Sequence, residues 1–250
     1  RGEYTAIHTK EGDEIDPAEV LALQMEKADI GATVDFIILP GMEKNEAKHR
    51  QDVTIRNALW AVKQTRREGF RIYASIQAWD AKSARRIMKK LAPYPFAGFA
   101  LGGMVPRVRD PEKIIEIVRA IRKVETKRPL HVFGIGKPEL VRHLFTEGVD
   151  SVDSSSYLKY AAEKKWLDPV AACYHPIPTA TTCPCRFCTE LGTAYMALDG
   201  ELNTMALALH NLETIMGISH VRNKDRFGGL INGMVCHNRV FLFISRKNTI

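Results

Sequence analysis

Short apolar runs alternate with amphipathic segments over the first two thirds of the chain, and this alternation predicts the fold class. Strand-like runs occupy residues 34–39, 71–76, 98–101, 131–135 and 151–152. Helix-like segments lie near residues 16–29, 46–69, 80–91, 111–125 and 137–147. Strands and helices that alternate in this way form parallel sheets with right-handed crossovers. The pattern therefore predicts an α/β fold, either a doubly wound sheet or a (β/α)8 barrel.

The later part of the chain departs from this alternation. Five strands are too few for a complete barrel, so the barrel alternative requires strands before Arg1 or in the C-terminal tail. After about residue 168 the pattern changes to an insertion with Pro and Cys at 174–191, followed by a helical pattern at 196–216. We therefore expect a barrel portion over 1–168, a cysteine-bearing subdomain over 169–216 and a C-terminal segment over 217–250.

The helix predicted near residues 81–91 has one basic face and one apolar face. The basic positions recur at helical spacing and are Lys82, Arg85, Arg86 and Lys89. The opposite face carries Ala84, Ile87, Met88 and Leu91. A solvated face above a buried stripe is the favoured interpretation, and a patch that follows nucleic-acid phosphates is the alternative.

Composition excludes several classes of protein. Of the 250 residues, 45% are hydrophobic and 26% are charged, enough to bury a core and to exclude wholesale disorder. Lysine and arginine exceed aspartate and glutamate by 36 to 29, and this excess suits a polyanionic partner. Neither a membrane-length apolar run nor a leader pattern opens the chain, so we expect a soluble, cytoplasmic protein without a membrane partner.

Three of the five cysteines are clustered, as Cys183, Cys185 and Cys188. Clustered thiols in a chain with few other cysteines indicate a metal site and not a disulfide framework. Thiolates favour tetrahedral Zn²⁺, which needs a fourth nitrogen or sulfur ligand. His210, on a predicted helix, is the preferred fourth ligand, and His237 is the alternative. Four protein ligands leave no open position, so the sequence predicts a structural zinc ion.

Polar residues and glycines collect where the predicted strands end. Asp35 lies within the segment 31–36, Gln77 and the pair Gly102 and Gly103 end two further strands, and Asp153 follows another. Active sites of parallel α/β folds lie at such carboxyl ends. A carboxylate and an amide can bind the polar edge of a guanine-like base, and glycines let a flat ring approach the backbone closely. A second carboxylate could attack an anomeric carbon, as in retaining glycoside chemistry.

Six short motifs follow one another over about residues 14–215 in an order that is typical of one family. They are Asp16-Pro17 with Gln24 and the segment 31–36, Ser75-Ile-Gln77, Leu101-Gly102-Gly103-Met104, Phe133-Gly-Ile-Gly136, Gly148-Val-Asp-Ser-Val-Asp153, and Cys183, Cys185 and Cys188 with His210-Asn211-Leu212. Through these motifs the chain resembles the tRNA-guanine transglycosylases and their DNA-acting relatives.

The resemblance implies a fold and an activity. The fold is a (β/α)8 TIM-type barrel with a zinc-binding insertion, here the subdomain over 169–216. The activity is a pentosyl transfer that exchanges guanine in a nucleic acid for a free 7-deazaguanine base of the preQ0 type. The nucleotide must leave its stack to be reached. The same resemblance is consistent with a homodimer or a paralogous partner subunit.

The resemblance also implies roles for individual residues. Asp153 is the nucleophile that forms a covalent glycosyl-enzyme intermediate. Asp35, Gln77 and the backbone of Gly102 and Gly103 bind the base, with Phe133 against its face. The structural Zn²⁺ is held by Cys183, Cys185, Cys188 and His210.

Three departures from the family pattern qualify these expectations. The family's Asp-Ser-Gly-Gly segment, which carries the acid/base aspartate, is absent and is expected before Arg1, which implies an N-terminally incomplete barrel. Ala78 and Trp79 follow Gln77 in place of glycines. A serine-rich segment over 154–160 replaces the Pro-Thr-Arg and Arg-Asn-Gly features that follow the nucleophile in the tRNA enzymes.

The serine-rich segment decides the favoured polymer. It resembles the DNA-modifying, DpdA-like branch, so DNA is favoured over tRNA as the substrate. The alternatives are a tRNA-guanine transglycosylase, a non-catalytic nucleic-acid-binding subunit on the same scaffold, and a zinc-stabilised barrel of sugar or nucleotide metabolism. Arg222, Lys224 and Arg226 of the tail would fit a nucleic-acid contact.

Overall fold

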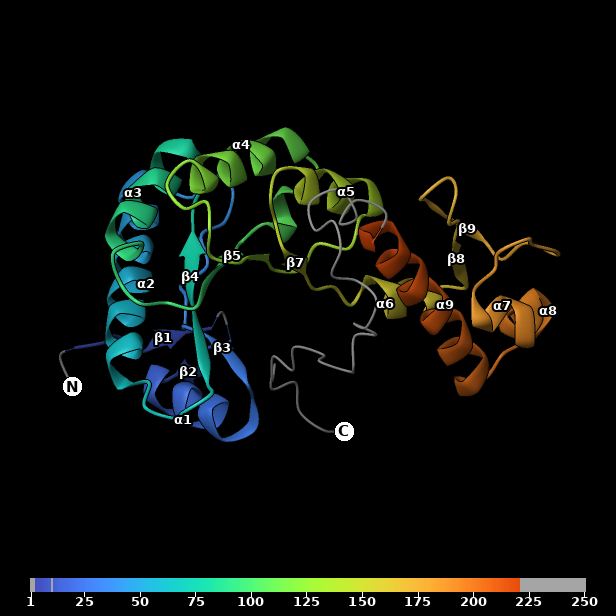
Figure 1. Cartoon of the computed structure of the whole chain (residues 1–250), viewed down its shortest axis with the longest axis horizontal. Helices are drawn as coiled ribbons and strands as arrows, with labels where there is room; N and C mark the ends of the chain where they lie inside the picture. The colour runs from blue at the N-terminus through green and yellow to red at the C-terminus, as the bar shows by residue number, and fades with distance from the viewer. Residues whose placement is uncertain (1–2, 10, 221–250) are drawn as a thin grey trace. The chain divides into compact units, whose positions relative to one another are not determined.

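The protein consists of two compact units in the computed structural model, which describes residues 3–9 and 11–220 (Figure 1). Unit 1 is described over residues 3–9 and 11–132, and unit 2 over residues 133–220. None of the helices in these ranges combines the length and the hydropathy that a membrane crossing requires. The tail positions Arg222, Lys224, Arg226 and His237 lie outside the described residues.

Unit 1 alternates strands and helices along the chain. Its elements are β1 (Ile7–His8), β2 (Glu14–Ile15), α1 (Pro17–Lys27), β3 (Ile30–Ala32), α2 (Lys44–Gln64), β4 (Arg71–Gln77), α3 (Ala81–Leu91), β5 (Gly98–Gly102), the 3-10 helix η1 (Val105–Arg107), α4 (Pro111–Arg122) and β6 (Leu130–Val132). Strands β3, β4, β5 and β6 lie side by side in that order and are parallel. The predicted α/β class with parallel strands is confirmed, and closure into a complete barrel stays a prediction.

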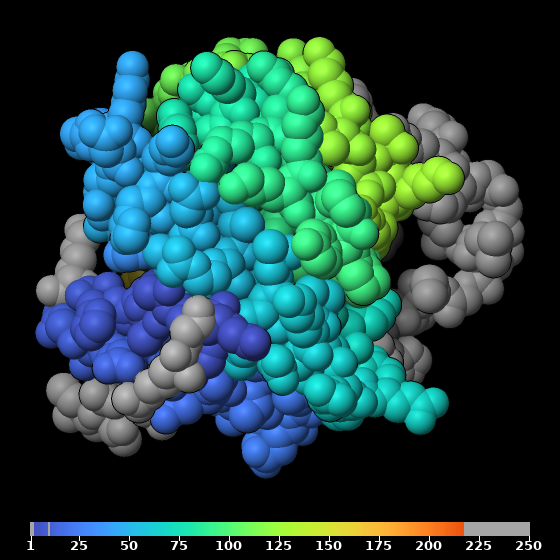
Figure 2. Space-filling model, turned by 90° about the vertical axis from the view of Figure 1, so that its left-hand side faces the viewer, coloured from blue at the N-terminus to red at the C-terminus, as the bar shows by residue number. Residues whose placement is uncertain are grey.

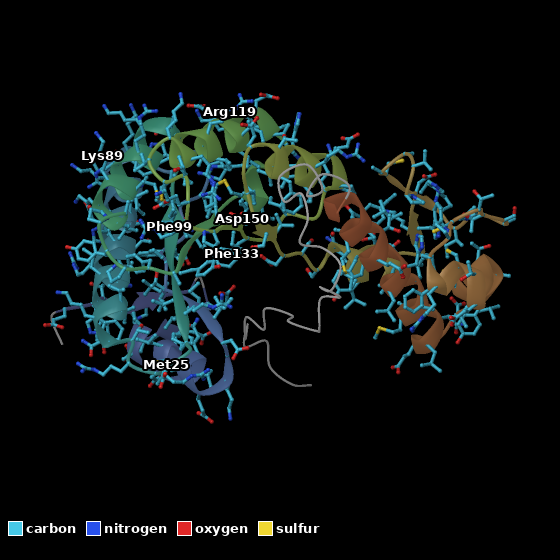
Figure 3. The ribbon with its side chains drawn as sticks, in the orientation of Figure 1. Met25, Lys89, Phe99, Arg119, Phe133 and Asp150 are labelled. Atoms are coloured by element: carbon cyan, nitrogen blue, oxygen red, sulfur yellow. The ribbon has the colours of Figure 1, made fainter. Side chains whose placement is uncertain are left out.

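The register of this sheet brings the ends of two strands together. Gln77, the last residue of β4, pairs with Gly102, the last residue of β5. Both strands are almost entirely buried, and Phe99 of β5 lies in the interior of unit 1 (Figure 3). A strand buried on both faces is typical of a parallel sheet covered by helices. The register therefore places Gln77 and Gly102 side by side at the carboxyl ends of the two strands.

The strand predicted at 34–39 is wrong, because the first strand of the parallel sheet is β3, Ile30–Ala32. After β3 the chain leaves the sheet, and side chains take the backbone donors that a strand would use for pairing. The N–H of Phe36 donates to Thr54 Oγ1 at 3.0 Å, and the N–H of Ile38 donates to Gln77 Oε1 at 3.1 Å. Satisfied in this way, the apolar segment forms a loop that runs across the carboxyl end of β4.

Helix α3 follows the predicted amphipathic pattern with one correction. The apolar positions are completely buried: Ala84, Ile87, Met88 and Leu91. Lys82, Arg85 and Lys89 are exposed, and Lys89 extends away from the ribbon (Figure 3). Arg86 does not belong to the exposed row, because it is half-buried and donates to Gln51 Oε1 and Asp52 Oδ1, both at 2.6 Å.

Unit 2 consists of short helices around one long helix. Its elements are α5 (Pro138–Thr146), β7 (Ser151–Val152), α6 (Ser156–Ala162), β8 (Lys165–Leu167), β9 (Tyr174–Pro176), α7 (Arg186–Glu190), α8 (Gly192–Ala197) and α9 (Glu201–His220). Helix α9 packs against α5, α6, α7, α8 and β8. Strands β8 and β9 form an antiparallel pair. The domain boundaries predicted at 168 and 216 stay predictions.

Candidate functional site

A buried amide at the carboxyl end of β4 organises the polar site of unit 1. Gln77 is completely buried, and its Nε2 donates a short hydrogen bond to Asp35 Oδ2. Its Oε1 accepts the N–H of Ile38 at 3.1 Å. The backbone carbonyl of Gln77 accepts Gln51 Nε2 at 2.7 Å. Because both ends of the amide and its own backbone are bonded, Gln77 has one defined orientation.

Two glycines keep the space in front of this amide clear of side chains. A Cβ on Gly102 would lie 2.5 Å from Gln77 Nε2 and 2.7 Å from Asp35 Oδ2, far inside contact distance. A Cβ on Gly103 would lie 2.7 Å from Gln77 Oε1, and the backbone of Gly103 has φ +72°, which favours glycine. Asp35, Gln77, Gly102 and Gly103 are thus brought together, and we call them the Asp35–Gln77 slot.

The carboxyl group of Asp35 lies in buried surroundings, where an ionised carboxylate is costly. Part of the residue reaches solvent, but the carboxyl is surrounded by protein, and this burial raises the pKa of Asp35. The hydrogen bond from Gln77 acts in the opposite direction and lowers the pKa. A hydrogen bond from the backbone N–H of Asp35 itself also lowers the pKa. A buried carboxyl is costly unless its oxygens are satisfied, which is why perturbed carboxyl groups indicate functional sites.

Asp153 lies in unit 2, directly after β7, whereas the exposed Asp150 precedes that strand (Figure 3). The N–H of Gly134 donates to Asp153 Oδ1 at 3.0 Å and orients the carboxylate. Gly134 has φ +74°, a left-handed conformation that glycine adopts without strain. Of the two aspartates that flank the strand, Asp153 is therefore the one at its carboxyl end, as the sequence predicts for a catalytic group.

The serine-rich segment after Asp153 packs closely on the same loop. Ser154 Oγ and Ser156 Oγ lie 2.9 Å apart. A Cβ on Gly136 would lie 2.1 Å from each of these hydroxyl oxygens, so any other residue at 136 would displace them. Phe133 is half-buried at the start of this unit, and its contact with a base stays a prediction.

The predicted metal ligands of unit 2 converge. Cys183 Sγ, Cys185 Sγ and Cys188 Sγ lie 3.8, 3.2 and 3.4 Å from His210 Nδ1. All four ligand atoms lie within 4.8 Å of one another, and all four residues are buried. The cluster can therefore hold one metal ion. The choice of His210 as the fourth residue of this cluster is supported, and His237 lies outside the described residues.

The protonation state of His210 suits a metal ligand. Its Nε2 lies 2.9 Å from the carbonyl oxygen of Leu167, so Nε2 carries the proton and donates it. Nδ1 then presents its lone pair to the three sulfur atoms. Burial lowers the pKa of His210, opposed by the Leu167 hydrogen bond, and keeps the ring neutral. Three thiolates and one neutral imidazole are a donor set that Zn²⁺ favours in closed structural sites.

A layer of residues around the cluster fixes the ligands. The Trp166 ring stacks on the His210 ring with centroids 4.7 Å apart and an interplanar angle of 6°. Asn211 Oδ1 accepts the N–H of Leu167 at 2.8 Å, and Asn211 Nδ2 donates to Lys165 O at 3.0 Å. Burial raises the pKa of the Cys185 and Cys188 thiols, so proton loss from them requires a cation.

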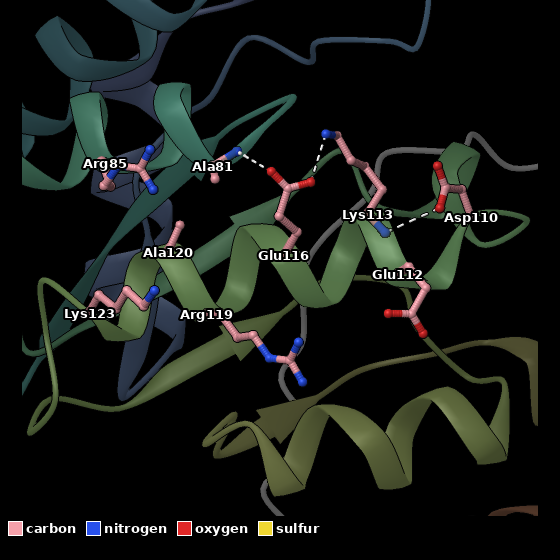
Figure 4. A pocket seen from close by; sticks show the side chains of 9 residues that line it. All are labelled: Ala81, Arg85, Asp110, Glu112, Lys113, Glu116, Arg119, Ala120 and Lys123. Atoms are coloured by element: carbon pink, nitrogen blue, oxygen red, sulfur yellow. Dashed lines mark hydrogen bonds and ion pairs between the residues drawn. The ribbon is translucent and has the colours of Figure 1, made fainter.

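A charged groove of about 520 Å³ lies between α3 and α4, apart from the slot (Figure 4). Two of its charged residues, Lys113 and Glu116, form an ion pair. Lys113 Nζ contacts Glu116 at 2.8 Å, Glu116 accepts the N–H of Ala81 at 3.3 Å, and Asp110 caps α4. None of the predicted base-binding or catalytic residues lines this groove. It is therefore not the candidate site, in spite of its size.

Sequence reasoning missed several residues that support the two sites. Gln51 stands among polar and charged residues and Trp166 follows two lysines, so neither carries a distinguishing signal. Asn211 was part of a motif, but its hydrogen bonds to β8 require the fold to be known. Arg107 is a buried charged residue near Gly103, and a lone arginine after a Gly-Gly pair has no pattern that would identify it.

Comparisons with known proteins agree with this arrangement. The family model described as queuine tRNA-ribosyltransferase matches residues 3–224. The tRNA-guanine(15) transglycosylase of Methanothermobacter thermautotrophicus is 26% identical over 225 residues, which cover 87% of this chain and 34% of that protein. The protein of the same name from Methanopyrus kandleri is 24% identical, with 80% of this chain and 44% of that protein covered.

A third relative extends the range of organisms. The tRNA-guanine(15) transglycosylase of Thermococcus onnurineus is 27% identical over 195 residues, with 75% of this chain and 33% of that protein covered. The chain thus spans between a third and a half of the length of these curated relatives. Since the family match covers most of the chain and the motif residues come together in each unit, the chain belongs to the queuine tRNA-ribosyltransferase family.

Proposed function

We propose that the protein exchanges guanine in tRNA for a free purine-like base, through a covalent intermediate on Asp153. The observation that carries the proposal is the Asp35–Gln77 slot, in which a buried carboxyl, an oriented amide and two obligatory glycines meet at one strand edge. Membership of the family supports base exchange as the reaction class. The names of the relatives support tRNA as the polymer, whereas the expectation of DNA gains no support from them.

The slot matches the hydrogen-bonding edge of guanine. Guanine presents the N1–H and the exocyclic amine as donors beside the O6 acceptor. Asp35 would accept the donors. Burial raises the pKa of its carboxyl, and a bound donor pair would act in the opposite direction by stabilising the ionised form. Gln77 Nε2 has two hydrogens, of which Asp35 takes one, so the other is available to O6. Gly102 and Gly103 would let the ring lie against the backbone.

Asp153 would perform the transfer in two displacements. In the first, a carboxylate oxygen bonds to C1′ of the ribose while the C1′–N9 bond breaks and guanine leaves with its electron pair. In the second, N9 of the incoming base bonds to C1′ while the bond from C1′ to Asp153 breaks and releases the carboxylate. The proton that the incoming base loses from N9 balances the proton that the departing guanine takes up. The N–H of Gly134 at 3.0 Å would hold the carboxylate in the orientation that the attack requires. A 7-deazaguanine of the preQ0 type is the proposed incoming base.

The cysteine cluster would hold a structural Zn²⁺. Zinc bound there would link α7 to α9 by its four bonds and would take no part in the transfer, because its ligand set is complete. Neighbouring residues of the chain would orient the histidine ligand. The carbonyl oxygen of Leu167 fixes the His210 tautomer, and Trp166 excludes water from one face of the His210 ring.

The exposed row of α3 is the proposed phosphate contact of unit 1. Helices α2 and α3 are both visible on the face drawn in Figure 2. Lys82, Arg85 and Lys89 of α3 are exposed, and no ion pair joins them to any residue that the structure describes. Arg85 also lines the groove between α3 and α4. Neighbouring cations differ, since Arg86 and Lys90 both contact Asp52. Unpaired cations at helical spacing would contact successive phosphates. Homodimer formation and a paralogous partner stay predictions.

Exchange in DNA is the second candidate, and the Ser154–Ser156 hydroxyl pair beside Asp153 favours it. One experiment tests both polymers. The full-length protein is incubated with radiolabelled guanine and either unmodified tRNA or double-stranded DNA, and label in the polymer is counted. We expect incorporation into tRNA. Incorporation into DNA alone would support the second candidate, and incorporation into neither would refute base exchange.

A further inference from the structure

We infer that Arg107 is a positioning residue of the Asp35–Gln77 slot, which it maintains by tying the loop after β3 to the loop after β5. This inference rests on the proposed function for the purpose of the slot, and on the contacts alone for the tie itself. Arg107 ends η1 and is 6% exposed.

One guanidinium nitrogen joins the two loops. Arg107 Nη1 donates to the carbonyl oxygen of Ile38 at 2.9 Å and makes a shorter hydrogen bond to the carbonyl oxygen of Gly103. Ile38 and Arg107 are 69 residues apart in the chain, so the contact is a long-range tie between the loops. The two carbonyl groups belong to the loops that carry Asp35 on one side and Gly102 on the other.

The tie is continuous with the amide that contacts Asp35. The peptide group of Ile38 donates its N–H to Gln77 Oε1 and accepts Arg107 at its own C=O. A Cβ on Gly103 would lie 3.4 Å from the carbonyl oxygen of Ile38, which shows how closely the two loops approach. Displacing Ile38 therefore removes a bond from Gln77, and Gln77 in turn orients Asp35.

A positive charge strengthens the hydrogen bonds that one nitrogen donates to two carbonyl oxygens. Two buried carbonyl oxygens carry partial negative charge and require donors, and a guanidinium supplies charge-assisted hydrogen bonds of fixed geometry. Burial lowers the pKa of Arg107, but an arginine keeps its proton at neutral pH. Among the described residues no ion pair includes Arg107, and its guanidinium donates to the backbone carbonyl groups of Ile38 and Gly103. The positive charge of Arg107 therefore serves to hold the two loops together.

The test compares Arg107→Met with a matched arginine. Arg128 is also partly buried and donates to backbone carbonyl groups, those of Ala92 and Tyr94, at the opposite end of β5. Arg128→Met therefore removes a carbonyl-binding arginine without touching the slot. Arg107→Lys is the conservative variant, because an ammonium retains the charge and can donate to the same oxygens.

Two measurements on the full-length protein separate the tie from the function. The first is amide hydrogen exchange over residues 36–41 and 102–105, which needs no activity. We expect Arg107→Met to accelerate exchange of the Ile38 N–H at least tenfold, Arg107→Lys to restore part of the protection, and Arg128→Met to leave it unchanged. The second is guanine exchange into tRNA, where we expect Arg107→Met to raise the KM for the base about tenfold and to change kcat less than threefold.

The outcomes separate the contact between the loops, the positioning role and the proposed function. If the rate of amide hydrogen exchange over residues 36–41 is equal in Arg107→Met and Arg128→Met, Arg107 does not join the two loops and the inference is overturned. If amide hydrogen exchange accelerates in Arg107→Met but the KM for the base stays unchanged, the positioning role is overturned although Arg107 does join the loops. If the wild-type protein exchanges no base while the amide result holds, the proposed function fails, and the positioning role fails with it.

Discussion

The slot of unit 1 and the cysteine cluster of unit 2 are both polar sites in buried surroundings, but they are assembled in opposite ways. Three ligands of the cluster come from six consecutive residues, 183–188, and the fourth comes from a nearby helix. The slot joins Asp35, Gln77 and Gly102 across three strand ends. Local spacing therefore reveals the cluster in the sequence, whereas the contacts within the slot become visible only through the register of the sheet.

The two sites also differ in how their polar groups are satisfied. In the cluster, the sulfur and nitrogen atoms converge on one point, so a single cation would satisfy all of them. In the slot, the groups bind each other, and the raised pKa of Asp35 shows that its ionised form is incompletely satisfied. The difference favours a structural role for the cluster and a ligand-binding role for the slot. Each prediction below tests that distinction.

The largest expected effect is loss of the metal from the cluster. We expect about one Zn²⁺ per chain, and chelation or Cys183→Ser should lower the unfolding midpoint by more than about 10 °C, because structural zinc binding is folding free energy. The KM for guanine should change less than about threefold while the protein remains folded. Metal analysis and thermal unfolding of the same preparation provide the measurement.

Cys173→Ser is the matched control for this experiment. Cys173 is exposed and lies outside the cluster, so its loss should change neither the zinc content nor the midpoint. A protein that contains no zinc and is unaffected by Cys183→Ser would show that the cluster is not a metal site.

The second effect tests the cost of the slot. Asp35→Asn removes a carboxyl whose native pKa lies above its unfolded pKa. Such a group binds a proton more tightly in the native state, so it lowers stability as pH rises above the unfolded value of about 3.9. We expect Asp35→Asn to be more stable than wild type at pH 7 and equally stable near pH 3. Thermal unfolding across this range measures the difference.

Binding should change in the opposite direction. Loss of the charged acceptor should raise the KM for guanine roughly tenfold or more, since a hydrogen bond to a charged group contributes about 1.5–3 kcal/mol. Asp13→Asn, at an exposed position, is the control and should alter neither property. An Asp35→Asn protein that is less stable than wild type at pH 7 would mean that Asp35 serves the fold and not a ligand.

The smallest effect concerns the α3 row, which belongs to neither site. Replacing Lys82, Arg85 and Lys89 with glutamine should weaken tRNA binding and reduce the slope of log K against log salt by roughly two, because each phosphate contact contributes about 0.7–0.9. Fluorescence anisotropy at several salt concentrations provides the slope.

The control for the row uses cations from other surfaces of unit 1. Lys27, Lys63 and Lys127 are exposed, and changing all three to glutamine removes the same net charge. An equal loss of slope in both triple variants would mean that only the overall charge matters. A slope that the α3 variant does not change would exclude the row as a contact surface.

Sequence patterns predicted the regular elements well where one face or both faces are buried. Strands β4 and β5 and helix α3 agree with their predicted ranges, because continuous apolar runs and a clean helical stripe each permit one arrangement. The segment 34–39 has the same apolar character, but Thr54 and Gln77 take its backbone donors, and a local pattern cannot show bonds to distant side chains.

The candidate site shows the same limit. The cysteine spacing and strand-end positions identified the metal ligands and the slot residues, because chemistry restricts which residue types occur there. Arg86 was expected on the basic face, yet its guanidinium lies between Gln51 and Asp52. Arg107 was not anticipated, because a tie between two loops depends on where both loops lie.

The central claim is that Asp153 forms a covalent bond to the ribose during base exchange, and trapping tests it most directly. The full-length protein is mixed with tRNA in the absence of an incoming base, and the products are separated under denaturing conditions. We predict a protein–tRNA adduct that maps to Asp153 and disappears on addition of guanine, with Asp153→Asn giving no adduct and exchange at least about 1000-fold slower. Exchange at the wild-type rate by Asp153→Asn, or an adduct on another residue, would contradict the account.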